Sequence, residues 1–298
     1  LGDVYKRQTY GTFKASNNIN LGIGKGKLIA LLGPSGSGKT TILRMIAGLE
    51  TADSGDIIID GKVVNDVPAS KRGIGFVFQN YALFRYMTVY DNIAFGLKVN
   101  KWKKSDIKKR VDELIELVGL SGMAKRYPSQ LSGGQRQRIG IARALALRPK
   151  LIICDEPVSA LDVSIQAQIL NLLSDLQKQF HLTYIFIAHG LPTVQHISSQ
   201  VAVMYLGKIV EQADKTTLFS RPMHPYTEGL MAAVPIPDPD LRTDDGPLLE
   251  GDMPSPTNLP QGCRFHPRCK YCQEKCLTQS PELQDCLLYT SPSPRDCS

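Results

Sequence analysis

The sequence predicts an α/β fold built around a phosphate-binding loop (P-loop), and three observations support this prediction. Residues 33–40 (GPSGSGKT) match the pattern G-x-x-x-x-G-K-[ST] at every fixed position. An apolar run at residues 28–32 precedes the loop and a helical pattern follows from about Lys39, which is the strand, loop and helix order that the motif needs. A length of 298 residues allows one large α/β domain with an appendage.

The residues of this loop predict how it holds a nucleotide. Glycines let backbone N–H groups turn toward phosphate oxygens, and the helix N-terminus adds partial positive charge. We expect Lys39 to reach the β- and γ-phosphates and the Thr40 hydroxyl to ligate Mg²⁺. A glycine-rich turn without a ligand is the alternative. The predicted nucleotide-binding residues here are Gly33, Pro34, Ser35, Gly36, Ser37, Gly38, Lys39, Thr40 and Thr41.

The next segment predicts a hairpin, a strand and a helical region. Residues 56–64 form the hairpin with Asp60 and Gly61 in its turn, and residues 74–78 form a strand. Gln79 follows that strand, at the sheet edge where α/β proteins bind ligands. Between residues 91 and 127 an apolar stripe recurs at helical spacing, and six Lys or Arg side chains in residues 101–110 indicate a solvated helix face rather than a nucleic-acid site. The stripe is Ile107, Val111, Leu114, Ile115 and Val118.

A second anion site is predicted where residues 131–135 (LSGGQ) open a helix that runs to about Leu147. Ser132 is a suitable N-cap, and two glycines leave N–H groups exposed at the positive end of the helix.

Two adjacent carboxylates end the apolar strand at residues 151–156. We expect Asp155 to hold Mg²⁺ through water and Glu156 to act as general base on the attacking water. A turn with two acidic residues and no catalytic role is the alternative.

Residues 159–162 (SALD) then lead into a helix with an apolar stripe, and residues 183–187 form another strand. His189 follows that strand, where an imidazole can bond the γ-phosphate, although a lone histidine is otherwise structural.

The two ends of the chain resemble in-frame translations of the transposase adapter used to build sequencing libraries. We therefore exclude residues 1–8 and 286–298 from the fold prediction. The formal net charge of +7 is mild; it suits an anionic membrane face but does not by itself indicate nucleic acid. No apolar run approaches the roughly 18 residues of a membrane span, so we expect a soluble or peripheral protein.

Four of the cysteines outside those ends gather in one tail, after a Pro- and Gly-rich linker at residues 235–260. The spacing C-x5-C-x2-C-x3-C suits an iron–sulfur cluster or zinc, because soft thiolates favour both. Clustering of this kind fits a reducing compartment better than a disulfide framework. The candidate ligands are Cys263, Cys269, Cys272 and Cys276.

With these motifs in this order, the chain resembles the nucleotide-binding subunit of ABC transporters. The fold that the resemblance implies is a mixed sheet core with an antiparallel β subdomain and a helical subdomain. Residues 33–40 look like the Walker A loop, 131–135 the signature and 152–155 the Walker B strand. Gln79 matches the Q-loop, His189 the switch histidine and Tyr10 the aromatic that stacks on adenine.

The resemblance implies that two subunits sandwich two ATP molecules, so that the signature of one chain (Ser132, Gly133, Gly134 and Gln135) meets the ATP of the other. It also implies that Asp162 in the D-loop contacts nucleotide, that Gln79 joins Thr40 and Asp155 at Mg²⁺, and that Glu156, His189 and Gln79 are catalytic. The expected domains are residues 9–234 for nucleotide binding, with a helical subdomain at about 86–147, and residues 235–285 for a C-terminal extension.

The two halves resemble different importers. Residues 76–98 look like the sulfate/thiosulfate importer ATPases, whereas residues 154–168, 224–227 and 233–235 look like the oligopeptide/dipeptide importer ATPases. A chimera of two genes joined near residues 131–138 is one hypothesis, and a natural mosaic is the alternative. The oligopeptide family can carry a [4Fe–4S] cluster at positions matching Cys263, Cys269 and Cys276, although its last ligand usually lies further downstream.

We therefore expect a bacterial importer ATPase that uses ATP and Mg²⁺ at the cytoplasmic face of the inner membrane. Its expected partners are the permease subunits, a second ATPase subunit of the same or a related kind and, indirectly, an extracytoplasmic substrate-binding protein, without nucleic acid. Peptides are the favoured cargo, with sulfate or a similar oxyanion as the alternative. A chimeric protein that binds ATP but has no transport partner is an alternative of another class.

Overall fold

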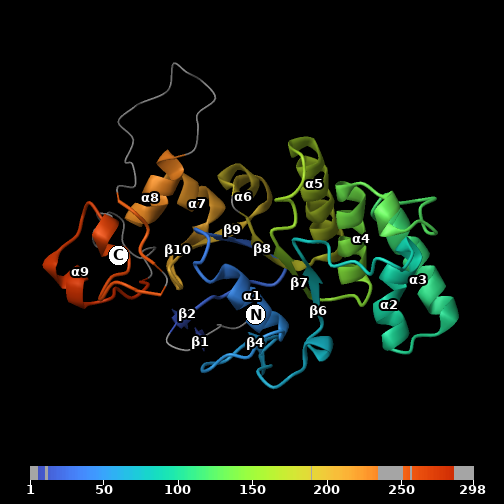
Figure 1. The fold of residues 1–298 in the computed structure, drawn as a ribbon, viewed down its shortest axis with the longest axis horizontal. Coiled ribbons are helices and arrows are strands. Elements are labelled where there is room, and N and C mark those ends of the chain that lie inside the picture. The colour runs from blue at the N-terminus through green and yellow to red at the C-terminus, as the bar shows by residue number, and fades with distance from the viewer. Residues whose placement is uncertain (1–5, 11–12, 189, 234–250, 256, 285–298) are drawn as a thin grey trace, which may run out of the picture.

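The computed structural model describes residues 6–10, 13–188, 190–233, 251–255 and 257–284, with residues 6–10 and 13–18 described only as backbone. A six-stranded mixed sheet lies at its centre, in the order β10-β9-β3-β8-β7-β6 (Figure 1). Only the pairing of β10 with β9 is antiparallel within this sheet. The strands are β3 (Leu28–Leu32), β6 (Ile74–Val77), β7 (Leu151–Asp155), β8 (Thr183–Ile187), β9 (Gln200–Tyr205) and β10 (Lys208–Asp214).

The central strands β3 and β8 are buried along their whole length, as their continuous apolar sequences require. Helix α1 (Lys39–Ala47) packs one apolar face on the sheet through Ile42, Leu43 and Ile46. On the opposite face of the sheet, α5 (Val163–Phe180) and α6 (Leu191–Ile197) contribute Ile169, Leu173 and Val194 to a second, larger core. The predicted α/β class and the predicted P-loop strand and helix are confirmed.

Two antiparallel hairpins accompany the main sheet. One pairs β4 (Ile58–Ile59) with β5 (Lys62–Val63), and its turn residues Asp60 and Gly61 both have left-handed backbone, with φ of 50° and 74°. Those angles suit a type I′ turn, so the Asp-Gly pair folds as its sequence predicts. The other pairs β1 (Lys6–Tyr10) with β2 (Phe13–Ile19). Residues 6–8, which the sequence analysis left out of the fold, therefore belong to a strand; their adapter origin stays a prediction.

Helices α2 (Val89–Val99), α3 (Lys104–Leu117) and α4 (Gly133–Leu145) gather on one side of the molecule, beside β6 (Figure 1). The predicted stripe of α3 is buried, and all five lysines of residues 101–110 are exposed. Arg110 is a correction to the predicted solvated face, because it is buried. Its guanidinium donates to the Leu145 carbonyl at 2.9 Å, near the end of α4, and pairs with Glu113. A helix end offers unpaired carbonyls, which explains why a buried arginine is stable there.

The C-terminal segments lie at the opposite side of the molecule, beyond β10 (Figure 1). Phe265 is buried against Tyr205 at the end of β9, with ring centroids 5.2 Å apart, and against Tyr226 of α8. Arg264 donates to the carbonyl of Leu206, which holds the same segment to the turn between β9 and β10. The remaining elements are α7 (Lys215–Ser220), α8 (Pro225–Ala232) and α9 (Glu274–Thr278).

Among the residues that the structure describes, no helix is both long enough and apolar enough to cross a membrane.

Candidate functional site

The phosphate-binding loop connects β3 to α1 in the middle of the sheet. Gly33 lies so close to β9 that a Cβ atom there would stand 2.2 Å from the Met204 carbonyl oxygen, so only glycine fits. Gly38, at the N-cap of α1, has φ of 90°, and no side chain caps this helix. The first backbone N–H groups of α1 therefore remain available to a phosphate.

Lys39 folds back over the loop. Its Nζ donates to the Gly33 carbonyl at 2.7 Å and to the Pro34 carbonyl at 2.8 Å, and it lies 3.3 Å from the Ser37 hydroxyl. Burial lowers the pKa of the Lys39 ammonium to about 8, and the charges of Glu156 and Asp155 partly oppose that effect. The ammonium thus sits over the loop held by neutral acceptors alone, which an anionic phosphate can replace.

Thr40 and Asp155 meet where the predicted magnesium site lies. The Thr40 hydroxyl donates to Asp155 Oδ1 at 3.1 Å, linking α1 to the end of β7. Burial, and next the charge of Glu156, raise the pKa of Asp155, so a cation at this carboxylate would be stabilised. Mg²⁺ in phosphate-binding sites commonly takes one or two protein oxygens and completes its shell with water and phosphate. The hydroxyl and carboxylate here fit that donor set.

Gln79 and Glu156 are in direct contact, although they are 77 positions apart in the sequence. The Gln79 side-chain amide donates to Glu156 Oε2 at 3.1 Å and lies 3.3 Å from the Ser159 hydroxyl. Glu156 has a left-handed backbone, with φ of 49°, which turns the chain immediately after β7. Sequence reasoning missed Ser159 as a neighbour of Gln79; its place in the SALD stretch beside Glu156 was the available signal.

The signature residues cap α4 as predicted. Ser132 Oγ accepts from the Gln135 amide at 3.3 Å, and Gln135 Oε1 accepts from the Ser132 amide at 3.0 Å. These two bonds form a capping box. Gly134 packs so closely on α5 that a Cβ there would be 2.6 Å from the Ile165 side chain. Within one chain this helix lies beside β6, whereas the phosphate loop follows β3, and β8 and β7 separate those two strands.

The remaining predicted site residues are Asp162, Tyr10, His189 and Thr41. Asp162 is the exposed N-cap residue of α5, without a side-chain cap bond. Tyr10 ends β1, where only its backbone is described, and His189 lies outside the described residues. Thr41 is half-buried in the first turn of α1.

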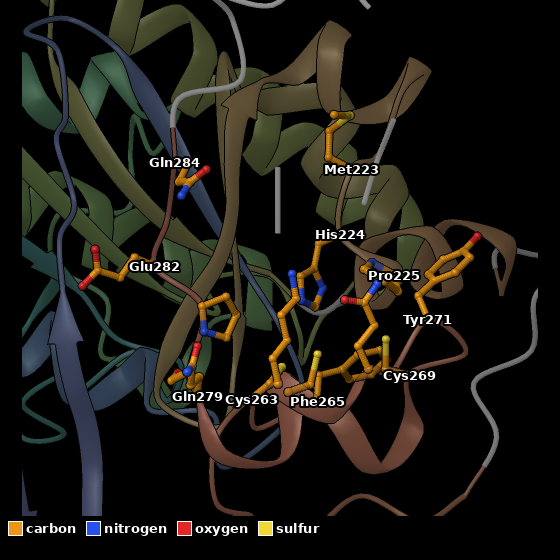
Figure 2. Close-up of a pocket in the computed structure, with 15 residues that line it drawn as sticks. Met223, His224, Pro225, Cys263, Phe265, Cys269, Tyr271, Gln279, Glu282 and Gln284 are labelled. Carbon is orange, nitrogen blue, oxygen red and sulfur yellow. The ribbon is translucent and has the colours of Figure 1, made fainter. Parts of the chain in front are cut away.

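The cysteine tail borders a cavity of about 370 Å³. Figure 2 shows His224 and Pro225 facing the segment of Cys263, Phe265 and Cys269 across this cavity. Cys276 also lines it, whereas Cys272 is exposed and outside the lining. Burial raises the pKa of Cys263 and of Cys269, which favours neutral thiols there. In the described part of the chain no three His, Cys, Asp or Glu residues are grouped to hold a metal ion, so these thiols as placed do not form the predicted metal site.

Two protein families match this chain. The family described as ABC transporter matches residues 16–159. The family described as oligopeptide/dipeptide transporter, C-terminal region, matches residues 210–276, which include the cysteine tail.

Curated relatives match almost the full length. An oligopeptide transport ATP-binding protein, OppF, of Salmonella typhimurium is 46% identical over 284 residues, covering 92% of this chain and 85% of the relative. A probable peptide ABC transporter ATP-binding protein of Sinorhizobium fredii is 43% identical over 283 residues, covering 91% of this chain and 79% of the relative.

A solved structure shares the fold. The ATP-binding cassette MJ0796, in a dimeric post-hydrolysis state bound to ADP and Pi, superposes with a TM-score of 0.64 at 32% identity. That match covers 72% of this chain and 97% of the cassette. Together with the phosphate loop, the Thr40–Asp155 pair and the capped signature helix, these matches show that the chain belongs to the ABC transporter ATP-binding family.

Proposed function

We propose that this ABC ATPase powers the uptake of oligopeptides or dipeptides through a membrane permease. The observation that carries the proposal is the match of residues 210–276 to the C-terminal region of oligopeptide/dipeptide transporters, joined to peptide-transport relatives over 91–92% of the chain. Cargo selectivity in this proposal belongs to the permease and its binding protein, and the chain supplies the energy.

The chemical step is phosphoryl transfer from ATP to water. Lys39 leaves the loop carbonyls and bonds the β- and γ-phosphates, while the N–H groups at the start of α1 hold the same anions. Thr40 and Asp155 would hold Mg²⁺, which would neutralise phosphate charge when bound. Glu156 accepts a proton from the attacking water, and Gln79, bonded to Glu156 Oε2 at 3.1 Å, orients that carboxylate and would also help to hold the metal. His189 completes this set by bonding the γ-phosphate.

We further propose that the working unit is a dimer with two composite sites. The phosphate loop and the signature helix of one chain are separated by two strands, β8 and β7, which supports a site shared between chains. Ser132 and the N–H groups of Gly133, Gly134 and Gln135 then bind the γ-phosphate held by the partner, with Asp162 beside it. Tyr10 stacks on adenine. The second chain is a copy of this one or a related subunit.

A groove between the sheet and the helical side suits a permease segment. It has a volume of about 430 Å³ and is lined by Phe76, Phe78, Phe84, Phe95 and Leu147. Phe84, Phe95 and Leu147 are 38–43% exposed, which is unusual for large apolar side chains unless a partner covers them. We propose that a permease helix docks here and that the subunit works at the cytoplasmic face of the inner membrane, with an extracytoplasmic binding protein as an indirect partner.

Three further proposals concern the cargo, the origin of the gene and the cysteine tail. The resemblance of residues 76–98 to sulfate/thiosulfate importers gives an oxyanion as the alternative cargo. A gene chimera joined near residues 131–138, with adapter-derived ends at residues 1–8 and 286–298, is the second. Single-molecule long reads of the source DNA test both the join and the ends, because a chimera predicts reads that never span the join. The full-length peptide-type relatives favour one continuous gene.

The third is a [4Fe–4S] cluster at the cysteine tail. Three thiols line one cavity, which supports it. The raised pKa of Cys263 and of Cys269, and the absence of a metal-holding group among the described residues, speak against a preformed site. Anaerobic purification followed by iron and zinc analysis tests it. If a cluster is present, iron should be bound by the parent protein, lost in Cys269→Ser and kept in Cys272→Ser, because Cys272 is exposed and outside the cavity lining. A parent protein without bound metal rules the cluster out.

The function itself is tested in proteoliposomes that contain a peptide permease. We expect ATP hydrolysis that rises when peptide-loaded binding protein is added, and that falls on the order of a hundredfold in Glu156→Gln while ATP binding persists. Stimulation by a sulfate-loaded system instead would reassign the cargo. Equal hydrolysis by Glu156→Gln and the parent would remove the general-base assignment.

A further inference from the structure

The chain adopts an unusual backbone directly after Gln79. Tyr81 and Ala82 both lie in the left-handed region, with φ of 58° and 47°, although neither is glycine. Two successive residues of this kind are costly and persist only where surrounding contacts hold them. Two backbone hydrogen bonds close the turn. The Tyr81 amide donates to the Phe78 carbonyl at 3.3 Å, and the Ala82 amide donates to the Asn80 carbonyl at 2.5 Å.

Arg143 of α4 holds this turn from the other side. Its Nη1 donates to the Ala82 carbonyl at 2.6 Å and its Nη2 donates to the Tyr81 carbonyl at 3.3 Å. One guanidinium is therefore hydrogen-bonded to both left-handed residues. The Cζ atom also lies 5.9 Å from the centre of the Phe84 ring. Burial lowers the pKa of the Arg143 guanidinium. The side chain still carries its positive charge, because the ordinary pKa of a guanidinium lies far above physiological pH. A planar fork with fixed donors suits two neighbouring carbonyls better than a lysine does.

The start of α4 touches the same turn. The guanidinium of Arg136 lies 5.4 Å from the centre of the Tyr81 ring, and a Cβ at Gly133 would be 3.1 Å from the Tyr81 hydroxyl. The turn is therefore fixed along α4 from its signature end to its last turn. Its other end is Gln79, whose amide reaches Glu156 at 3.1 Å.

We propose that Arg143 is a positioning residue for hydrolysis. It ties the strained turn at Tyr81 and Ala82 to the signature helix α4. Because Gln79 precedes this turn, the position of α4 then sets the distance between the Gln79 amide and Glu156. A shift of α4 on meeting the partner's nucleotide then changes the Gln79–Glu156 contact. The catalytic part of this inference, the effect on hydrolysis, rests on the proposed roles of Gln79 and Glu156. The structural part, that Arg143 holds the turn, does not depend on those roles.

Hydrogen exchange of the full chain tests the structural part and needs no ATP hydrolysis. In Arg143→Ala we expect the amides of residues 79–84 to exchange at least about tenfold faster, because the turn opens more often. The matched control is Arg138→Ala on the same helix, which donates at 2.8 Å to the Val118 carbonyl instead. It should leave residues 79–84 unchanged. Equal exchange of this segment in both variants overturns the proposal.

A double-mutant cycle tests the catalytic part. We expect Arg143→Ala to lower kcat about tenfold or more with the KM for ATP changed less than about twofold, and Arg143→Lys to recover part of that loss. In a Gln79→Ala background the same Arg143→Ala change should cost nothing further, because both act through one contact. An undiminished loss in that background overturns positioning through Gln79.

The two tests separate the possible failures. If the parent protein shows no Lys39-dependent hydrolysis, the proposed function fails and hydrogen exchange still decides on Arg143. If hydrolysis behaves as proposed and residues 79–84 are unaffected in Arg143→Ala, only the positioning role is rejected.

Discussion

Lys39 illustrates how a single residue is prepared for its ligand. Lys39 is buried, with 5% of the residue exposed, and its ammonium is bonded only to neutral oxygens of its own loop. Burial is the main reason that its pKa falls to about 8, because the charged form is poorly solvated there. A triphosphate supplies the missing negative charge, so the ligand and the proton on Lys39 stabilise each other.

This coupling predicts a pH dependence of ATP binding. Below pH 8 Lys39 is already protonated in the unliganded protein, whereas above pH 8 binding must also take up a proton. The affinity should therefore fall by about twofold or less between pH 7 and 8 and weaken by up to about tenfold per pH unit above that range. Calorimetry in buffers of different ionisation enthalpy measures the proton uptake. Lys39→Arg is the control, because it stays charged; the same pH slope in that variant would contradict the assignment.

At the scale of elements, the segment around Phe265 attaches to the domain through a buried aromatic cluster. Phe265 is 2% exposed and meets Tyr205, Tyr226 and His224, and Arg264 bonds the Leu206 carbonyl beside it. The pKa of His224 is lowered by burial to about 4, so its imidazole stays neutral at physiological pH. Phe265 is the buried apolar side chain of this end, and the partly buried Leu259, Cys263 and Cys269 pack on the same core.

Phe265→Ala should release the C-terminal segment. Removing a buried phenylalanine side chain costs about 3–5 kcal/mol, because its apolar contacts are lost and a cavity remains. We expect faster proteolysis near residue 262 and lower resistance to urea, with ATP binding retained. Leu277→Ala is the control, since Leu277 is 46% exposed and its loss should change stability by less than about 0.5 kcal/mol. Similar proteolysis of both variants would show that Phe265 is not the attachment point.

The elements that sequence alone predicts well are those with local signals. The Asp60–Gly61 turn, the burial of β3 and the Ser132–Gln135 cap each depend on residues within a few positions of one another. Arg110 and Arg143 are different, because both satisfy carbonyls more than thirty positions away. Nothing in the sequence near Arg143 reports the left-handed turn at Tyr81 and Ala82. The Gln79–Glu156 contact is likewise non-local, and motif order indicated only that both residues lie near the nucleotide.

The whole molecule places the phosphate loop and the signature helix at different strands of one sheet. A composite site between two chains therefore predicts complementation between defective variants. Lys39→Ala and Ser132→Arg should each be inactive alone, because every composite site in either homodimer lacks one component. A mixture should regain hydrolysis, since a mixed dimer contains one intact site. ATPase assays of the two variants, alone and mixed, measure this; a mixture that stays inactive would favour a site within one chain.

The attachment of the C-terminal segment also has a consequence for how such proteins diversify. It docks beside β9 and β10, at the opposite end of the sheet from β6, Gln79 and α4. A module grafted there can be gained, lost or exchanged during evolution without touching Gln79 or the signature helix. The phosphate loop is nearer, because the Gly207 amide of the β9–β10 turn donates to the Ser37 carbonyl at 3.0 Å. The same separation makes that edge a suitable point for a genetically fused reporter, which would follow the subunit without contacting Gln79 or α4.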